Sequence, residues 1–429
     1  MAQFEPPDGG WLGWSQVAAS FLTNVCTLGL SNSFGVFQSY YEHNTLKSHS
    51  SSDISWIGTT QGFLLSIVGI VSGPLYDRGY IRYLMITGSI LNVVGLLATS
   101  YAEEYSLIFL SYGLALGLGC GALYIPSQAT IQTYFTTKSA LANGIAMAGS
   151  SFGGIIYPII FRELQQSIGF AWTCRTLALI NGVLLTISCL LIRPRARTEE
   201  TSTISTFNWR AFWNRDLLIL GTCALLLNMG VDVPYYYTSI FVQEKLHSDA
   251  GVGDSLLASL NASSLVGRVA LSWLAKYVNP LNIWQSNILA ACVLLFCWSS
   301  VGNLPGMIVF VILYGFQVGG LIALITSCVR AICPDPDVIG ARLGLVEAFQ
   351  GVGFLVGPPI AGAILETPSG YLGVSIFCGT LYFALFLAVG FFTWRQFFGM
   401  PAVERPSDDV ELSDTLSVTI MRRPSLRGH

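Results

Sequence analysis

The chain has 429 residues, of which 52% are hydrophobic and only 10% are charged. Soluble globular proteins carry about 25% charged residues, and a soluble fold of this size could not cover its surface with so few charges. This composition excludes an ordinary soluble protein. The formal net charge of −3 leaves no basic surface, which argues against nucleic acid as a partner.

Long apolar runs, separated by short polar breaks, predict an all-α membrane protein with twelve transmembrane helices. A span needs roughly 20 apolar residues, and the runs are too long and too continuous for the alternating strands of a membrane barrel. We place the spans at 11–38, 54–75, 82–101, 105–133, 139–162, 170–192, 216–243, 254–276, 281–301, 305–330, 340–365 and 371–398.

The distribution of Lys and Arg between the loops predicts the orientation. Of the 21 basic residues, sixteen fall on the side that holds both termini and four on the other, with Arg268 inside a span. Because cytoplasmic loops are enriched in Lys and Arg, both termini should be cytoplasmic. We expect a multi-pass protein of the plasma membrane with five segments: a cytoplasmic N-terminus (1–10), a six-helix bundle (11–192), a cytoplasmic linker (193–215), a second six-helix bundle (216–398) and a disordered cytoplasmic tail (399–429).

The two halves of the chain repeat each other weakly. In the fifth span, Gly144, Ala148, Gly153 and Pro158 match the residues 200 positions later in the eleventh span, namely Gly344, Ala348, Gly353 and Pro358. Single matches could arise by chance in Gly-rich spans, but the constant register favours a duplicated six-helix unit. Proteins built in this way commonly hold a ligand between the repeats, near the bilayer midplane.

Three ionisable residues inside the spans are candidate site residues, because a charge at membrane depth is costly. Arg268 lies eight residues before Lys276, or ~12 Å from the cytoplasmic end of its helix. Asp232 lies between Gly230 and Pro234, where proline should break the helix. Asp232 and Glu347 are both candidates for carrying a proton. The alternatives are structural: an interhelix role for Arg268, neutralisation of Asp232 by Arg268 or by a tyrosine hydroxyl, and pairing of Glu347 with Arg342 or Arg268.

The turn after the second span contains Asp77 and Arg78, which could bridge helices and lock a cytoplasmic gate. Solvation of an ordinary loop is the alternative. We assign Lys138 and Arg342, on the same side of the membrane, to the same gate.

Three segments resemble known motifs. Residues 8–14 (DGGWLGW) resemble the N-terminal signature of the monocarboxylate transporter family, with one extra residue between the tryptophans. Residues 134–150 (YFTTKSALANGIAMAGS) resemble the signature that enters the fifth helix of that family. Residues 73–79 (GPLYDRG) are similar to a loop of the wider major facilitator superfamily. The short linker and the start of the sixth span look like fungal members.

The resemblance implies two six-helix halves in a major facilitator fold and a carrier that works by alternating access. It also implies a role for Arg268, which looks like the family's eighth-helix arginine that binds a substrate carboxylate. Two positions depart from the animal lactate carriers: Ser264 stands where those proteins have an aspartate, and Asn32 lies near the place of their first-helix lysine. Lactate-type proton symport is therefore disfavoured, and a larger, less charged substrate becomes plausible.

We predict a secondary transporter that exports a carboxylate-bearing secondary metabolite, and not an enzyme. The alternatives are proton-coupled uptake of a monocarboxylate or vitamin-like nutrient, and a nutrient sensor on a carrier fold. The expected partners are a small-molecule substrate, the lipid bilayer and, as a candidate, protons; we expect a monomer without cofactor or metal. The predicted substrate-binding residues are Arg268, Asp232, Tyr235, Tyr236, Tyr237, Asn32, Asn261 and Gln128.

Overall fold

The computed structural model describes residues 9–49, 51–193, 215–248, 250–332 and 339–397, and across these ranges it contains helices and no strand. The first half comprises α1 (Gly10–Asn24), η1 (Val25–Gly29), α2 (Phe34–Tyr40), η2 (Tyr41–Thr45), α3 (Ser51–Ile67), α4 (Gly69–Asp77), α5 (Ile81–Thr99), α6 (Tyr105–Ile108), η3 (Phe109–Leu116), α7 (Gly117–Tyr134) and α8 (Ser139–Leu191). The second half comprises α9 (Arg215–Val231), α10 (Val233–Leu246), α11 (Ala250–Leu274), α12 (Pro280–Trp298), α13 (Leu304–Ile332), α14 (Ile339–Leu365) and α15 (Gly370–Phe397). The predicted all-helical fold class is confirmed.

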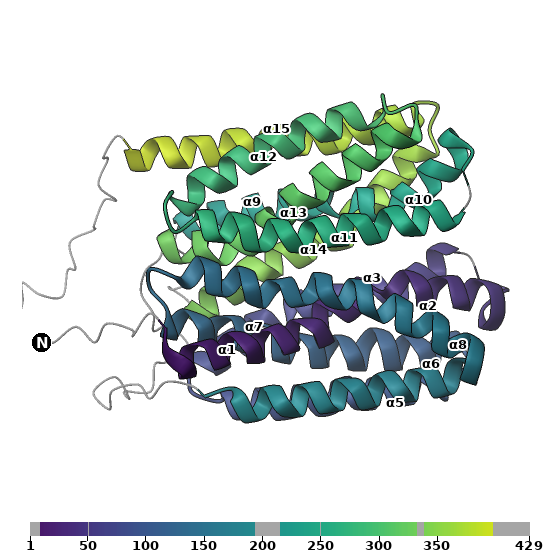
Figure 1. Ribbon diagram of the computed structural model, residues 1–429, viewed down its shortest axis with the longest axis horizontal. Coiled ribbons are helices and arrows are strands. Elements are labelled where there is room, and N and C mark those ends of the chain that lie inside the picture. Colours follow the sequence, from purple (N-terminus) through teal and green to yellow (C-terminus); the bar gives the residue numbers. More distant parts are fainter. Residues whose placement is uncertain (1–8, 50, 194–214, 249, 333–338, 398–429) are drawn as a thin grey trace, which may run out of the picture. The chain divides into compact units, whose positions relative to one another are not determined.

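Helix breaks fall inside several predicted spans. The first span is interrupted by a turn at Asn32 before α2 begins, and the second span divides between α3 and α4. Conversely, α8 covers both the fifth and the sixth predicted spans, and it doubles back on itself in Figure 1. The reversal occurs at Gly169, whose φ of +78° is a conformation that glycine adopts without steric cost.

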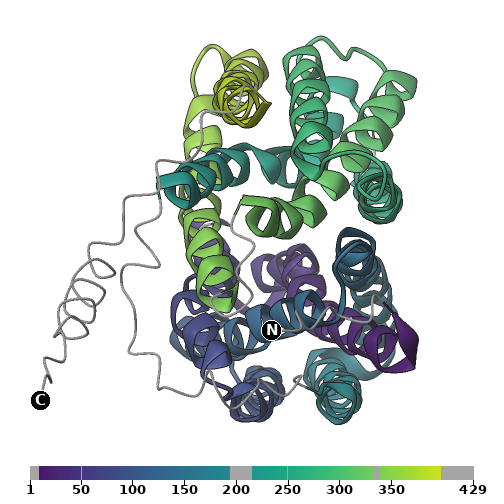
Figure 2. The same cartoon turned by 90° about the vertical axis from the view of Figure 1, so that its left-hand side faces the viewer.

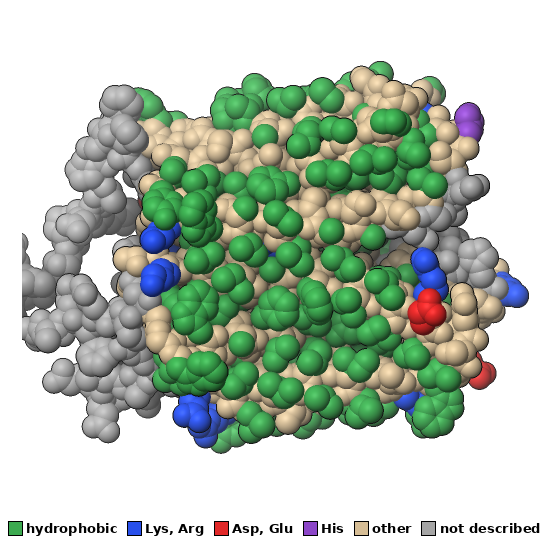
Figure 3. Space-filling view, in the orientation of Figure 1, with side chains coloured by type: hydrophobic (Ala, Val, Ile, Leu, Met, Phe, Trp, Pro, Cys, Tyr) green, Lys and Arg blue, Asp and Glu red, His purple; other side chains and the backbone are tan. Residues whose placement is uncertain are grey.

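Nine helical segments of the described chain are long and apolar enough to cross a membrane. The long helix α11 is not among them, because polar side chains such as Asn261 and Arg268 lower its mean hydropathy. Large apolar side chains lie on the outside of the helices, including Leu190 at 74% exposure and Leu179 at 68%. Figure 3 shows hydrophobic side chains spread over one face, with the charged ones toward its two ends. This distribution matches an integral membrane protein, whose surface faces hydrocarbon instead of water.

Equivalent glycines of the two halves contact equivalent helices. A Cβ atom at Gly153 of α8 would lie 2.8 Å from the Cα of Gly29, in the first span. A Cβ at Gly353 of α14 would lie 2.3 Å from the carbonyl oxygen of Leu225 in α9, the seventh span. Small residues at these positions let the helix backbones approach closely. The duplicated register predicted from the sequence is therefore present in the packing, and Figure 2 shows α1–α8 and α9–α15 as two groups of helices.

The predicted division into two bundle domains stays a prediction, because residues Met1–Gly390 form one compact unit. The second unit is Phe391–His429, of which the structure describes the last turns of α15, where the Phe391 and Trp394 rings stack with centroids 6.3 Å apart. Most of the predicted N-terminal segment and linker, and all of the predicted tail, lie outside the described residues.

Candidate functional site

The predicted helix break at Asp232 is present. Helix α9 ends at Val231, and α10 begins at Val233 with Pro234 in its first turn, where the missing N–H of proline costs no hydrogen bond. The Asp232 carbonyl accepts a hydrogen bond from the Tyr236 N–H at 3.1 Å. The Asp232 carboxylate itself makes no hydrogen bond or ion pair with any described residue. A partly buried acid thus lies at a break in a spanning helix.

Arg268 on α11 is buried, with 3% of its surface exposed. Its Nη1 donates a hydrogen bond to the carbonyl of Met147 at 3.0 Å, and its Nε donates to Ser264 Oγ at 3.4 Å. Asp232 lies within electrostatic reach of the guanidinium, but no carboxylate of the described chain comes within 4.0 Å of it. The second terminal nitrogen, Nη2, donates to no described residue. The cation therefore has a free donor and no carboxylate in direct contact, although Asp232 lies within electrostatic reach.

Tyr124 connects α7 to α14 and was not predicted. Its hydroxyl donates to Oε1 of the buried Glu347 at 3.2 Å, and it lies 3.7 Å from the sulfur of Met147. It is also within electrostatic reach of Arg268. A signal was available in the sequence: Tyr124 precedes the predicted Gln128 by four residues, so both lie on one face of the helix.

Gln128 is 2% exposed, and neither its amide oxygen nor its amide nitrogen has a hydrogen-bond partner. Buried polar atoms are nearly always paired. An unpaired amide here, between Tyr124 and Gln132 along α7, marks a place where a polar ligand or water can bind.

Two predicted asparagines from different halves meet at Gly154 of α8. A Cβ at Gly154 would lie 3.2 Å from Cβ of Asn32 and 3.1 Å from Oδ1 of Asn261. Both distances are shorter than ordinary van der Waals contact, so the glycine lets the two asparagine side chains approach α8 closely.

The three predicted tyrosines of α10 have different surroundings. Tyr235 is close to Ser264 and Arg268, so it belongs to the cluster around the cation. Tyr236 is 39% exposed. The hydroxyl of Tyr237 donates to the carbonyl of Pro358 at 3.1 Å, which directs this side chain into packing against α14.

Asp77, at the end of α4, forms two hydrogen bonds across to the start of α14. Its carboxylate oxygens accept from the N–H groups of Gly340, at 3.1 Å, and Ala341, at 2.7 Å. A carboxylate is favourable here, because the first N–H groups of a helix have no partner within the helix and carry partial positive charge. Contact is close: a Cβ at Gly73 would lie 2.2 Å from the Gly340 carbonyl oxygen.

Of the other residues predicted for this gate, Arg78 and Lys138 are exposed, and Arg342 is half-buried on α14. Arg330, in the last turn of α13, was not predicted for this gate; it donates from Nη1 to the carbonyl oxygens of Gln132, at 3.1 Å, and Phe135. These bonds join α13 to the end of α7, so the two halves are tied together at this end of the helices.

Comparison of the amino-acid sequence with known proteins identifies a matching family profile and several relatives. The Major Facilitator Superfamily profile matches residues 17–337. The chain is 36% identical to the MFS-type transporter dbaD of Emericella nidulans, over 84% of this chain and 80% of that protein. It is 33% identical to the aspyridones efflux protein apdF of the same fungus, over 90% and 78%, and 34% identical to the agnestins efflux protein AgnL12 of Paecilomyces divaricatus, over 85% and 83%.

Solved structures show the same fold at low sequence identity. The Major Facilitator Superfamily transporter FucP in its outward conformation matches with a TM-score of 0.70 and 14% identity, over 88% of this chain and 97% of that one. The human organic anion transporter MFSD10 matches with a TM-score of 0.69 and 12% identity, over 90% and 100%.

Proposed function

Because the chain belongs to the Major Facilitator Superfamily, and is therefore a multi-pass membrane transporter and not an enzyme, we propose that it exports a carboxylate-bearing secondary metabolite by alternating access. Two relatives are named as efflux proteins, for aspyridones and for agnestins, and their similarity extends over most of both chains. The motifs at residues 8–14 and 134–150 support the finer assignment to the monocarboxylate transporter family. The plasma membrane is the proposed location.

Arg268 is the observation that carries the proposal. A buried guanidinium with one free terminal nitrogen and no carboxylate within ion-pair distance is a binding site for an anion. The planar fork of Arg presents paired donors that match the two oxygens of a carboxylate. Tyr235 and the amides of Gln128, Asn32 and Asn261 supply neutral polar groups for the rest of the substrate.

The contacts of Asp77 and Arg330 support assigning the structure to a conformation of the transport cycle that is closed at the end where these residues lie. Under the proposed orientation, with both termini in the cytoplasm, these contacts close the path on the cytoplasmic side. Loading from the cytoplasm then requires the Asp77 bonds to Gly340 and Ala341 to break. The bonds re-form before the opposite side opens and the substrate leaves there.

The test begins with identification of the substrate. We would delete the gene in its host and measure which metabolite shifts from the medium to the cells, then follow transport of that metabolite into inside-out vesicles. Arg268→Lys retains the charge but loses the bidentate fork. At equal abundance in the membrane, it should weaken substrate affinity by roughly tenfold to a hundredfold, from the loss of ~1.5–3 kcal/mol for a charged hydrogen bond.

The matched control is Arg82→Lys, which makes the same substitution at an exposed position of α5. It should leave affinity unchanged. Wild-type affinity in Arg268→Lys would contradict the carboxylate clamp, and a metabolite that accumulates in the medium after deletion would indicate uptake instead of export.

Asp232 and Glu347 are the proposed sites for proton coupling. Asp232 faces Arg268, Tyr235 and Tyr382, and Glu347 faces Tyr124. The experiment compares Asp232→Asn and Glu347→Gln in vesicles with and without an imposed pH gradient. The variant that removes the proton carrier should transport equally in both conditions, and retained stimulation by the gradient in both variants would reject both residues.

A further inference from the structure

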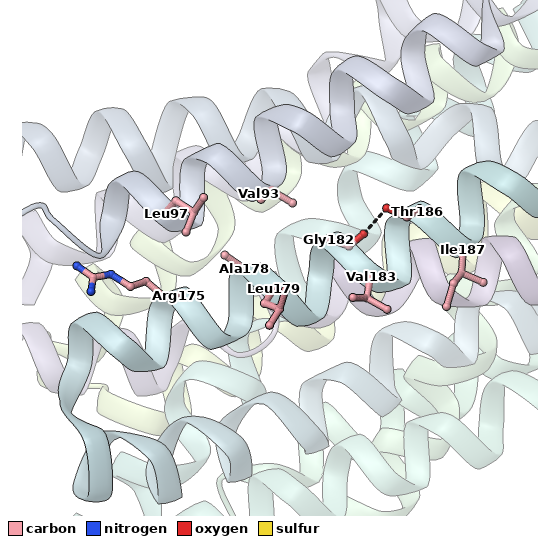
Figure 4. A pocket seen from close by; sticks show the side chains of 9 residues that line it. All are labelled: Val93, Leu97, Arg175, Ala178, Leu179, Gly182, Val183, Thr186 and Ile187. Carbon is pink, nitrogen blue, oxygen red and sulfur yellow. Dashed lines mark hydrogen bonds between the residues drawn. The ribbon is translucent and has the colours of Figure 1, made fainter.

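A groove on the outside of the first half runs along two helices that play no part in the proposed substrate site. It lies between α5 and the segment of α8 that follows Gly169, and it encloses about 490 Å³. Its lining residues are Val93, Leu97, Arg175, Ala178, Leu179, Gly182, Val183, Thr186 and Ile187. Figure 4 shows these side chains as a row along α8 facing two from α5, with Arg175 at one end.

The floor of the groove is apolar. Val183 and Ile187 are 51% and 41% exposed. The one hydroxyl of the lining, on Thr186, donates to the carbonyl of Gly182 at 2.6 Å, so it is satisfied within its own helix. Gly182 has no side chain, which deepens the groove at this point. A Cβ atom added there would lie 3.5 Å from a methyl group of Val93, which is an ordinary van der Waals distance.

Arg175 is held in place at the end of the groove. Its Nε donates to Ser100 Oγ at 3.3 Å, and its guanidinium carbon lies 4.6 Å from the ring centre of Tyr101 and 4.8 Å from that of Trp172. Both rings are largely exposed, as is typical of aromatic residues at a membrane interface. No ion pair joins Arg175 to an acid of the described chain, and its terminal nitrogens donate to no described residue.

The dimensions of the groove match one leaflet of a bilayer. Arg175 and Ile187 are twelve residues apart, or ~18 Å along the helix, and half of the hydrocarbon core is ~15 Å thick.

We propose that this groove binds one anionic membrane phospholipid, with an acyl chain along Leu179, Gly182 and Val183 and the phosphate on the guanidinium of Arg175. The charge of Arg175 and its open donors select a lipid with net negative charge over a zwitterionic or uncharged one. Under the proposed orientation, this lipid belongs to the leaflet that faces away from the cytoplasm. The site is separate from Arg268, so it does not depend on the identity of the transported substrate.

The experiment uses the full-length protein in nanodiscs of phosphatidylcholine that contain a small fraction of phosphatidylglycerol with a diazirine on its acyl chain. After illumination, peptide mapping should locate the label on α5 near Val93 and on α8 near Gly182. Arg175→Gln should weaken labelling roughly tenfold, which corresponds to about 1.4 kcal/mol, whereas Arg175→Lys should retain most of it. Gly182→Phe, which fills the groove, should abolish it, and the control Leu289→Phe, on the exposed surface of α12, should not.

A competition experiment on the wild-type protein keeps the test independent of how the variants fold. Unlabelled phosphatidylglycerol should displace the label, and diacylglycerol, which has the same chains without phosphate, should not. Equal displacement by both lipids, unchanged labelling in Arg175→Gln, or displacement by a sterol alone would overturn the proposal.

Discussion

Removal of the Asp77 carboxylate should open the cytoplasmic gate. The two hydrogen bonds from Gly340 and Ala341 are charge-assisted, and each such bond contributes ~1.5–3 kcal/mol. Water can reach the helix start once the halves separate, which returns part of this energy. We therefore expect Asp77→Ala to disfavour the closed state by about 2–4 kcal/mol, or a ~30- to 1000-fold change in the ratio of closed to open molecules.

A distance measurement between the halves can detect this shift. Tyr80 and Tyr277 are exposed residues beyond the ends of α4 and α11, in different halves, and both can be replaced by cysteine for spin labelling. In the otherwise wild-type protein the labels should report mainly one distance. Asp77→Ala should add a longer one, and Asp77→Asn, which retains one acceptor oxygen without the charge, should give an intermediate population.

Ser72→Ala is the matched control on the same helix, because the Ser72 hydroxyl donates to Gly121 within the first half at 3.1 Å. It removes a buried hydrogen bond without touching the contact between the halves. If Asp77→Ala leaves the distances unchanged, or if Ser72→Ala shifts them equally, the carboxylate does not hold the gate and our reasoning is refuted.

Two further predictions concern the interior. Tyr124→Phe removes the hydrogen-bond donor to Glu347 and leaves a buried carboxyl oxygen unpaired. Thermal unfolding should therefore show that the free energy of unfolding falls by ~1–3 kcal/mol. Unchanged stability would mean that the 3.2 Å bond contributes nothing. Gly154→Ala adds a Cβ atom 3.1 Å from Oδ1 of Asn261 and 3.2 Å from Cβ of Asn32, so these side chains must shift. Substrate affinity should fall in vesicle transport at equal abundance in the membrane, and normal affinity would remove this position from the substrate site.

The sequence alone was sufficient to place the apolar spans and to identify Arg268 as a charge inside one of them. A bilayer requires each span to be apolar over its whole length and to satisfy its own backbone hydrogen bonds, so span positions are encoded locally. The break at Asp232 was equally predictable, because Pro234 acts on the residues beside it. The register of the repeat could be read from the spacing of Gly153 and Gly353, since only small residues allow the backbones to approach.

The partners of the site residues were decided by the tertiary structure. Periodicity indicates which face of α7 carries Tyr124, but it does not say that Glu347, 223 residues later, lies opposite. The same holds for Arg330, whose place at the end of the predicted span 305–330 gave no sign of its bonds to the end of α7. Such pairs form between helices of different halves, so they depend on how the halves dock in this conformation. Neither the apolar length of a helix nor its residue spacing contains that information.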